Sequence, residues 1–519
     1  MKAEKSGSLI QPLEDRHRDY LQDESRTSGI AESISFPKNE AQVQAIVKIL
    51  LEQHQPITVQ GSRTGITGGA VPVRGHILNL SKMTKVMGLE LDNEGKFSIR
   101  VQPGISLAEL DQQLYSGRFD RHSWDQNALS ALEAFNKADR QFWPPDPSER
   151  SASIGGIAAN NSRGICAHHY GPAGHHIKRI RVVDMNGRIH SITRGQFVFA
   201  QGICPLPGGT RIRVDPANLQ PESPNDLMDL YLGSEGMLGV ITELTLSLQA
   251  LPRELWGIVF FFEAPSQAVD FLQAIDQRQK NESDTDIVAI EFMDQTTLEC
   301  IREYKSETGR LREVPAWDTR LAAAVYMEIH GNHPEEVEAL SEWLLETAAE
   351  CGSDPDTTWA FCGEIEIERL RLFRHAAPEA VNHLVDKARQ VDSRIAKLGT
   401  DMRLRNGSLS EMLEMYEKDL QARGLKAAIF GHAADKHFHV NILPQNFRQF
   451  DEGRALMEDW AKKISAMGGN ITAEHGVGKI KKNLFRSIPL PVRLKVIRSL
   501  KRQLDPNGLW NPGNMLNSD

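Results

Sequence analysis

Three glycine-rich segments in the first half of the chain constrain its fold more than any other feature. The first, 61–69, has four glycines in nine residues and follows a strand predicted over 56–60. The second spans 151–164, and the third, 233–243, leads into a strand predicted over 239–248. Glycine lets a backbone approach an anion closely and direct several N–H groups at it. Taken alone, the first segment is also explained as an ordinary turn after a strand.

Helices and strands alternate around these segments, which predicts the α+β fold class. Residues 39–53 carry apolar side chains at helical spacing, with Asn39 and Gln42 as candidate capping residues. Further helices are predicted over 106–114, 266–277 and 334–351, and strands over 56–60, 77–80, 97–101, 177–183, 189–192, 239–248, 256–262, 427–430 and 438–443. The strands 177–183 and 189–192 form a predicted hairpin with an Asn-Gly turn. We interpret 116–145 as an insertion or long loop and 211–226 as a loop.

Composition excludes several classes of protein. A chain of 519 residues holds more than one hydrophobic core. Its net charge is 60 − 69 = −9 without a long basic block, which argues against a nucleic-acid partner. The longest apolar runs, such as 256–262, fall short of the roughly 20 residues of a membrane-spanning helix. Residues 1–8 lack the apolar core of a secretory signal, and the five cysteines form no Cys-x-x-Cys pair. We therefore expect a cytoplasmic protein with reduced thiols.

Histidines and a carboxylate cluster in the C-terminal half. Residues 431–441 contain three histidines, and Glu474 directly precedes a fourth, His475. His432 and His439 are 439 − 432 = 7 residues apart, which is not the spacing of a helical zinc pair. They would have to converge across a loop onto a strand. Without further context, histidines near a strand are more often core or surface residues than metal ligands.

The glycine segments, with Pro144-Pro145-Asp146-Pro147-Ser148 before the second, resemble those of a known family. In this order they are similar to the FAD-linked oxidoreductases of the p-cresol methylhydroxylase (PCMH) and vanillyl-alcohol oxidase superfamily. The resemblance implies a PCMH-type FAD-binding domain of two α+β subdomains and an α+β cap domain with an antiparallel sheet. The implied domains are an N-terminal segment 1–30, the FAD-binding domain 31–252, the cap or substrate domain 253–470, and a segment 471–519 that returns to the flavin.

Carried over to this chain, the resemblance assigns FAD to residues of the glycine segments and to one C-terminal asparagine. The residues are Gly61, Ser62, Arg63, Thr64, Gly65, Gly68, Gly69, Pro145, Ser153, Gly155, Gly156, Asn160, Ser162, Gly164, Glu235, Gly239, Val240, Ile241 and Asn511. Some members of the superfamily tether FAD through a histidine in the first loop. Residues 61–69 contain no histidine, so we expect non-covalent FAD.

The histidine segments resemble the D-2-hydroxyacid dehydrogenase branch, which includes D-lactate, D-2-hydroxyglutarate and glycolate dehydrogenases. This resemblance implies that His432, His439 and Glu474 bind a divalent metal, zinc or manganese, and that His475 is the catalytic base. The chain departs from the commoner Gly-His-x-Gly-Asp-Gly-Asn-x-His form, with Ala434, Lys436 and His437 in place of Gly, Gly and Asn. We expect His437 to be an exposed side chain, with a substrate contact as the alternative.

Residues 369–375 resemble the Trp-x-x-Arg segment of this branch. Arg374 is therefore the candidate for the substrate carboxylate, which a guanidinium binds bidentately; a solvated arginine on a helix is the alternative. Where relatives have Lys-Tyr-Asp, this chain has Gly399-Thr400-Asp401. Lys397, Arg403 and Arg405 are the candidates to replace that lysine.

The resemblance implies a catalytic, FAD- and metal-dependent dehydrogenase. We expect a small D-2-hydroxy acid to be oxidised to the 2-oxo acid, with its hydride passing to flavin N5 and then its electrons to a quinone, a cytochrome or an electron-transfer flavoprotein. The alternatives are a metal-independent flavin oxidoreductase acting on another alcohol, a non-catalytic flavin electron-transfer subunit, and a metal-dependent hydrolase. A homodimer is the candidate assembly, and attachment to the surface of the inner membrane is the alternative to a purely cytoplasmic location.

Overall fold

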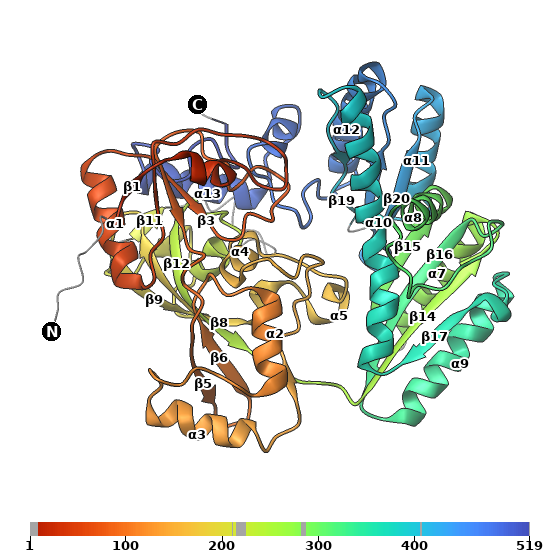
Figure 1. The fold of residues 1–519 in the computed structure, drawn as a ribbon, viewed down its shortest axis with the longest axis horizontal. Coiled ribbons are helices and arrows are strands. Elements are labelled where there is room, and N and C mark those ends of the chain that lie inside the picture. The colour runs from red at the N-terminus through yellow and green to blue at the C-terminus, as the bar shows by residue number, and fades with distance from the viewer. Residues whose placement is uncertain (1–8, 210, 214–224, 282–286, 405–406, 518–519) are drawn as a thin grey trace. The chain divides into compact units, whose positions relative to one another are not determined.

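The chain folds into two compact units (Figure 1). The computed structural model describes residues 9–209, 211–213, 225–281, 287–404 and 407–517. Unit 1 is formed by Met1–Gly164, Gly171–Leu251 and Glu474–Asp519, and unit 2 by Ile165–Tyr170 and Pro252–Ala473. Residues 1–8, on which the absence of a signal was argued, most of the predicted loop 211–226, and Arg405 lie outside the described residues.

The first layer of unit 1 is a four-stranded sheet in the order β1-β2-β4-β3. Its strands are β1 (Gln11–Pro12), β2 (Ser33–Ser35), β3 (Ile57–Gln60) and β4 (His76–Asn79), with β2 and β3 parallel to β4. Helix α1 (Glu40–Glu52) connects β2 to β3 and buries four apolar side chains. The Asn39 side chain accepts a hydrogen bond from the Gln42 amide (3.0 Å), which confirms the predicted helix and its cap.

The second layer of unit 1 is a five-stranded antiparallel sheet in the order β5-β6-β12-β8-β9. The strands are β5 (Val86–Leu91), β6 (Phe97–Val101), β8 (Ile177–Asp184), β9 (Ile189–Thr193) and β12 (Gly239–Ser247). Strands β8 and β9 form the predicted hairpin, and Gly187 takes the left-handed conformation (φ +75°) that its turn requires. Shorter antiparallel pairs join β7 (Gln141–Phe142) to β13 (Gln249–Ala250) and β10 (Ile203–Pro205) to β11 (Arg211–Arg213).

Helices and short 3₁₀ segments complete unit 1. They are η1 (Asp15–Leu21), α2 (Leu107–Ser116), α3 (Gln126–Phe135), α4 (Ile154–Asn160), η2 (Ala173–His176), α6 (Leu227–Tyr231), η5 (Lys481–Arg486) and α13 (Val492–Leu504). Helix α3 corrects the interpretation of 116–145 as a loop. Asp125 caps it, and its buried residues follow helical spacing, so that Phe135 packs edge-on against Phe97 of the sheet at 5.5 Å between ring centroids.

Unit 2 is built on an eight-stranded antiparallel sheet. Its main order is β17-β14-β16-β15-β20-β21-β18, and β19 also pairs with β21. The strands are β14 (Glu254–Phe262), β15 (Ile287–Asp294), β16 (Ala323–Gly331), β17 (Trp359–Cys362), β18 (Leu398–Gly399), β19 (Met402–Arg403), β20 (Ala427–His432) and β21 (His437–Ile442). The antiparallel sheet expected in the second half of the chain is confirmed.

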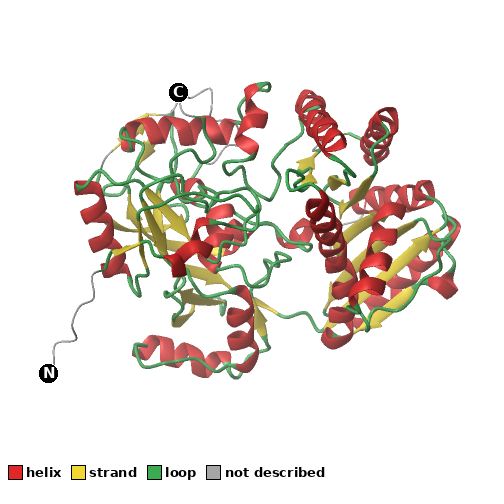
Figure 2. Ribbon diagram, turned by 45° about the horizontal axis from the view of Figure 1, so that its top comes forward, coloured by secondary structure: helices red, strands yellow, loops and turns green. Residues whose placement is uncertain are grey.

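Helices pack on both faces of this sheet (Figure 2). They are α5 (Ala167–Tyr170), α7 (Pro265–Asn281), α8 (Gln295–Thr308), α9 (Pro334–Glu350), η4 (Pro355–Thr357), α10 (Glu364–Val391), α11 (Leu409–Arg423) and α12 (Phe447–Ala466). Phe271 of α7 contacts Phe260 and Phe262 on one face, whereas Phe373 of α10 contacts Phe261 on the other. In the described part of the chain, no helix combines the length and apolarity needed to cross a membrane.

Candidate functional site

The first two glycine segments meet in unit 1. Loop 61–69 begins where β3 ends, and the Oγ of Ser153, the N-cap of α4, accepts hydrogen bonds from the amides of Ser62 (3.4 Å) and Gly156 (3.3 Å). A Cβ at Gly61 would lie 2.1 Å from the Ser153 Oγ, so this approach requires glycine. The loop and the start of α4 are therefore in direct contact, and we call the two together the glycine cradle.

The third glycine segment contacts the C-terminal end of α4. The Gly233 amide donates to the Ala158 carbonyl (3.0 Å), and the Glu235 amide donates to the Ala159 carbonyl (2.9 Å). Asn160, the last residue of α4, donates to the Ser162 hydroxyl at 3.1 Å and to the Glu474 carbonyl at 2.7 Å. The three segments that are far apart in the sequence are thus neighbours in unit 1.

Glu235 ties this region to the C-terminal part of the chain. Its half-buried carboxylate accepts hydrogen bonds from the amides of Val477 (2.7 Å) and Gly478 (2.9 Å), and its carbonyl accepts a hydrogen bond from the Asn511 side chain (2.7 Å). Burial raises the pKa of Glu235, and these amides oppose that effect. The carboxylate therefore positions the segment that begins with Glu474.

The remaining residues that the resemblance assigned to FAD have varied surroundings. Val240 and Ile241 are buried within β12. A Cβ at Gly164 would lie 2.1 Å from the Asp146 carbonyl oxygen, so this glycine permits a close backbone packing. Arg63 lies over the Tyr20 ring, 4.4 Å from its centroid, and donates to the Asp19 carbonyl.

Lys479 was not singled out from the sequence, although it directly follows the Glu-His-Gly-x-Gly motif. Its ammonium donates to the carbonyls of Gly68 and Gly69 (both 3.3 Å) and to the Asn511 side chain (3.0 Å). Burial lowers the pKa of Lys479 to about 8. Lys479 thus fastens the C-terminal segment to the glycine cradle.

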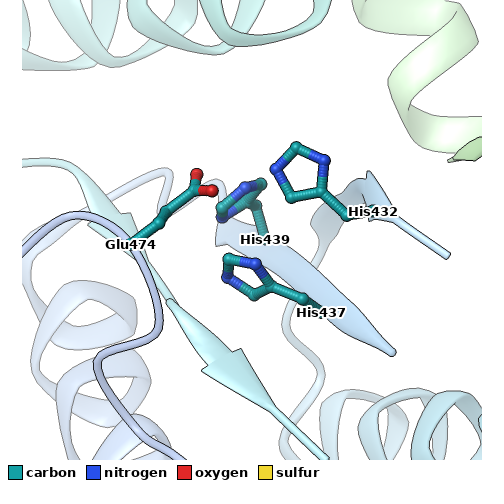
Figure 3. A group of neighbouring side chains, drawn as sticks. All are labelled: His432, His437, His439 and Glu474. Atoms are coloured by element: carbon teal, nitrogen blue, oxygen red, sulfur yellow. The ribbon is translucent and has the colours of Figure 1, made fainter. Parts of the chain in front are cut away.

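Three histidines share one face of the β20–β21 hairpin in unit 2. His432 and His437 are direct partners across the ladder, and His439 lies two residues further along β21. Because side chains alternate along a strand and direct partners point the same way, all three imidazoles lie on the same face. Their ring centroids are 5.3 Å apart for His432 and His437, 4.6 Å for His437 and His439, and 5.6 Å for His432 and His439 (Figure 3).

Each of these imidazoles forms a hydrogen bond to an acceptor oxygen elsewhere in unit 2. His432 Nδ1 donates to the carboxylate of Glu291. His437 Nε2 donates to Asp401 Oδ1 (3.0 Å), and His439 Nδ1 donates to the Thr400 carbonyl (3.3 Å). Carbonyl and carboxylate oxygens only accept, so in a neutral ring each of these bonds places the proton on the bonded nitrogen. The lone pairs then reside on Nε2 of His432, Nδ1 of His437 and Nε2 of His439, as is usual for metal-binding histidines.

The chain leads directly from this cluster to Glu474 and His475. Ala473, the last residue of unit 2, donates its amide to the Asp401 carbonyl (3.0 Å), and Glu474 follows it. The potential ligand atoms of the three imidazoles, which Figure 3 draws, lie within 4.8 Å of one another. His475 Nε2 lies 3.1 Å from Glu474 Oε1. Imidazole nitrogens and carboxylate oxygens are both ligands that suit zinc.

The burial of His437 corrects the expectation that it is exposed. Its side chain is 0% exposed, and so is that of its partner Asp401. Because Asp401 is 36 residues earlier in the chain, nothing in the local sequence around His437 reports this contact.

Arg374 is buried, which excludes the alternative of a solvated arginine. Its Nε donates to the carboxylate of Glu291, which also accepts from His432. Burial raises the pKa of Glu291, but the charge of Arg374 and the hydrogen bonds from His432 and Arg374 outweigh burial and hold the pKa below its ordinary value. Of the candidates for the missing lysine, Arg403 donates to Asp435 (2.9 Å), and Lys397 donates to Asn382 (2.9 Å).

Sequence comparison identifies the family. The profile of the FAD-linked oxidases, C-terminal domain, matches residues 252–515, and that of an FAD binding domain matches 31–126 and 127–193. The chain belongs to the FAD-linked oxidases. The resemblance carried by the glycine and histidine segments is thereby confirmed.

Curated relatives of this FAD-linked oxidase include hydroxyacid dehydrogenases. It is 25% identical over 516 residues to the D-lactate dehydrogenase of Anaerostipes hadrus, which covers 96% of this chain and 92% of that protein. It is 24% identical over 493 residues to the D-2-hydroxyglutarate dehydrogenase of Stutzerimonas stutzeri (strain A1501), covering 93% and 90%.

A solved structure supports the fold of the FAD-linked oxidase. The crystal structure of p-cresol methylhydroxylase with substrate bound matches with a TM-score of 0.65 at 15% identity, covering 98% of this chain and 95% of that one. The expected α+β fold, with a PCMH-type FAD-binding domain and an α+β cap domain, is confirmed.

Proposed function

We propose that this FAD-linked oxidase oxidises a D-2-hydroxy acid, of the D-lactate or D-2-hydroxyglutarate class, to the corresponding 2-oxo acid. The observation that carries the proposal is the imidazole cluster on the β20–β21 hairpin, from which the chain runs directly into Glu474 and His475. The names of the relatives in Anaerostipes hadrus and Stutzerimonas stutzeri support this substrate class.

The glycine cradle fits the pyrophosphate of FAD. Backbone amides of loop 61–69 would hold it, since four of these nine residues are glycines, whose backbone can approach an anion closely. Loop 61–69 contains no histidine, which supports a dissociable flavin. When bound, FAD supplies the two-electron acceptor for the hydride that leaves C2 of the substrate.

The histidine cluster fits a divalent cation. His432, His439 and Glu474 would hold it, because the acceptors Glu291 and Thr400 orient both imidazoles with a lone pair on Nε2. Nitrogen and carboxylate ligands suit zinc, with manganese as the alternative. Such an ion, when bound, supplies positive charge that stabilises a developing alkoxide.

His475 would accept the proton of the substrate hydroxyl. A proton on Nε2 directed at Glu474 leaves the lone pair of the neutral ring on Nδ1, and the neighbouring carboxylate stabilises the imidazolium that forms. Glu235 holds the following amides of Val477 and Gly478, which limits the movement of this base.

Arg374 would bind the substrate carboxylate. Glu291 accepts from its Nε, so the two terminal nitrogens of the guanidinium would provide the bidentate contact. A quinone, a cytochrome or an electron-transfer flavoprotein would serve as the final electron acceptor.

Anaerobic reduction of the bound flavin tests this proposal. Purified protein is mixed with D-lactate or D-2-hydroxyglutarate, and L-lactate serves as the matched control. We expect at least one D-acid to bleach the absorption band of the oxidised flavin and L-lactate to leave it unchanged. Reduction by L-lactate alone, or by none of these acids, contradicts the proposed substrate class.

A further inference from the structure

We propose that His437 is a third imidazole ligand of the divalent metal and sets the preference of the site for zinc over manganese. This inference rests on the metal in the proposed function but concerns a residue outside the ligand set that the resemblance implied. The commoner form of the motif has asparagine at this position, so the ligand belongs to this chain rather than to the motif.

The hairpin register places His437 inside the cluster. It is the direct cross-strand partner of His432, and its ring is 4.6 Å from that of His439, the shortest of the three separations between the centroids. Figure 3 shows the ring of His437 beside those of His432 and His439. Its ligand atom and those of His432 and His439 lie within 4.8 Å of one another.

Asp401 orients His437 in the way expected for a ligand. The carboxylate accepts from Nε2 at 3.0 Å, and both side chains are fully buried. The neutral ring consequently carries its lone pair on Nδ1, and the carboxylate raises the basicity of that nitrogen. Asp401 is itself held in unit 2, because its carbonyl accepts from the Ala473 amide.

A third imidazole changes which metal the site selects. Manganese favours carboxylate, carbonyl and water oxygens, whereas imidazole nitrogen suits zinc. Two histidines and a carboxylate admit either ion, but a third neutral nitrogen strengthens binding of zinc more than that of manganese. Zinc accepts a fifth ligand during catalysis, so four protein ligands still allow the substrate to coordinate.

The test is competition between zinc and manganese in the purified flavoprotein. Protein stripped of metal by a chelator is titrated with each ion against a chromophoric competitor, for the wild type and for His437→Asn. We expect the substitution to weaken zinc binding at least about tenfold and manganese binding much less, since even losing a residue that orients a ligand costs about 10–100-fold. His383→Asn is the matched control, because His383 pairs with Glu307 away from the cluster and should leave both affinities unchanged.

A second measurement needs no variant. X-ray absorption at the zinc edge of the wild-type protein should report three imidazoles per zinc, and two would overturn the inference even if His437→Asn failed to fold. Zinc and manganese affinities unchanged in a folded His437→Asn would overturn it as well.

These outcomes separate this inference from the proposed function. If His432→Ala and His439→Ala lose metal while His437→Asn retains wild-type zinc and manganese affinities, only the role of His437 is wrong. If the wild-type protein binds neither ion, the metal in the proposed function is wrong too, and the inference falls with it.

Discussion

Arg374 donates from Nε to the carboxylate of Glu291, and both side chains are buried, at 3% and 0% exposure. Arg374 lies on α10 and Glu291 on β15, so the ion pair fastens the helix to the sheet. The same carboxylate accepts a hydrogen bond from His432. One buried carboxylate therefore connects the helix to the edge of the histidine cluster.

Replacing Arg374 with methionine should strongly destabilise the fold. The substitution leaves the charge of Glu291 buried without the guanidinium, and breaking a buried pair in this way costs about 3–5 kcal/mol. The measurement is the free energy of unfolding from denaturant titration. The double variant Arg374→Met/Glu291→Gln should recover part of the loss, because the glutamine still accepts from His432 but carries no charge. A loss below about 1 kcal/mol in the single variant would show that the ion pair contributes little.

Glu235 should be required for a well-positioned Glu474–Gly478 segment. In Glu235→Gln one acceptor oxygen becomes an amide that cannot accept from Val477 or Gly478, which should cost about 1–3 kcal/mol. We expect slower reduction of the flavin by substrate as well as lower stability. Glu243→Gln is the control, since Glu243 lies on β12 near Arg100 and Arg181 rather than near this segment. If both substitutions lowered the stability and the rate of flavin reduction equally, the positioning role of Glu235 would be contradicted.

The sequence predicted those helices and strands whose apolar spacing, caps or turns lie within the segment itself. The apolar stripe of 39–53 and its Asn39 cap identified α1, and the Asn-Gly turn identified the β8–β9 hairpin. Helix α3 also carries a cap and a stripe, but two of its buried positions are alanines, Ala128 and Ala131, in a polar stretch. Such a weak stripe does not stand out, and the helix was missed.

Contacts between distant residues could not be predicted in the same way. His437 is buried with Asp401 beside it, and Arg374 is buried with Glu291, 83 residues earlier, accepting its hydrogen bond. A single sequence without its fold does not report such partners. The motif order could indicate the chemistry of the site, but the burial of its charged residues depends on the tertiary structure.

His475→Ala should abolish reduction of the flavin by a D-2-hydroxy acid while FAD stays bound. Without the imidazole, the substrate hydroxyl loses the base proposed for it, and loss of general base catalysis lowers rates by roughly 10²–10⁴-fold. Anaerobic stopped-flow absorbance measures the rate, and the flavin spectrum measures FAD content. His190→Ala removes an imidazole paired with Asp184 in the β8–β9 hairpin and should leave the rate unchanged. An unaltered rate in His475→Ala would assign the proton to another group.

Asp294 should make the stability of the protein depend on pH. It caps α8 and accepts from the amides of Thr297 (2.8 Å) and Ile429 (3.0 Å), and burial raises its pKa to about 6. An unfolded aspartate has a pKa of about 3.9, so between these values the folded protein holds more protons than the unfolded chain. The free energy of unfolding should therefore fall as pH rises through this window, by at most about 3 kcal/mol, and level off above it.

Asp294→Asn isolates this effect. Asparagine caps helices as well as aspartate does and accepts the same two amide bonds, but it does not ionise. The variant should therefore gain stability relative to the wild type as the pH is raised from about 4 to about 7.5, which spans the two pKa values of Asp294. Denaturant titrations of both proteins at the two pH values measure the change. A constant difference between the proteins would mean that the Asp294 carboxyl ionises in the folded state as readily as it does in water.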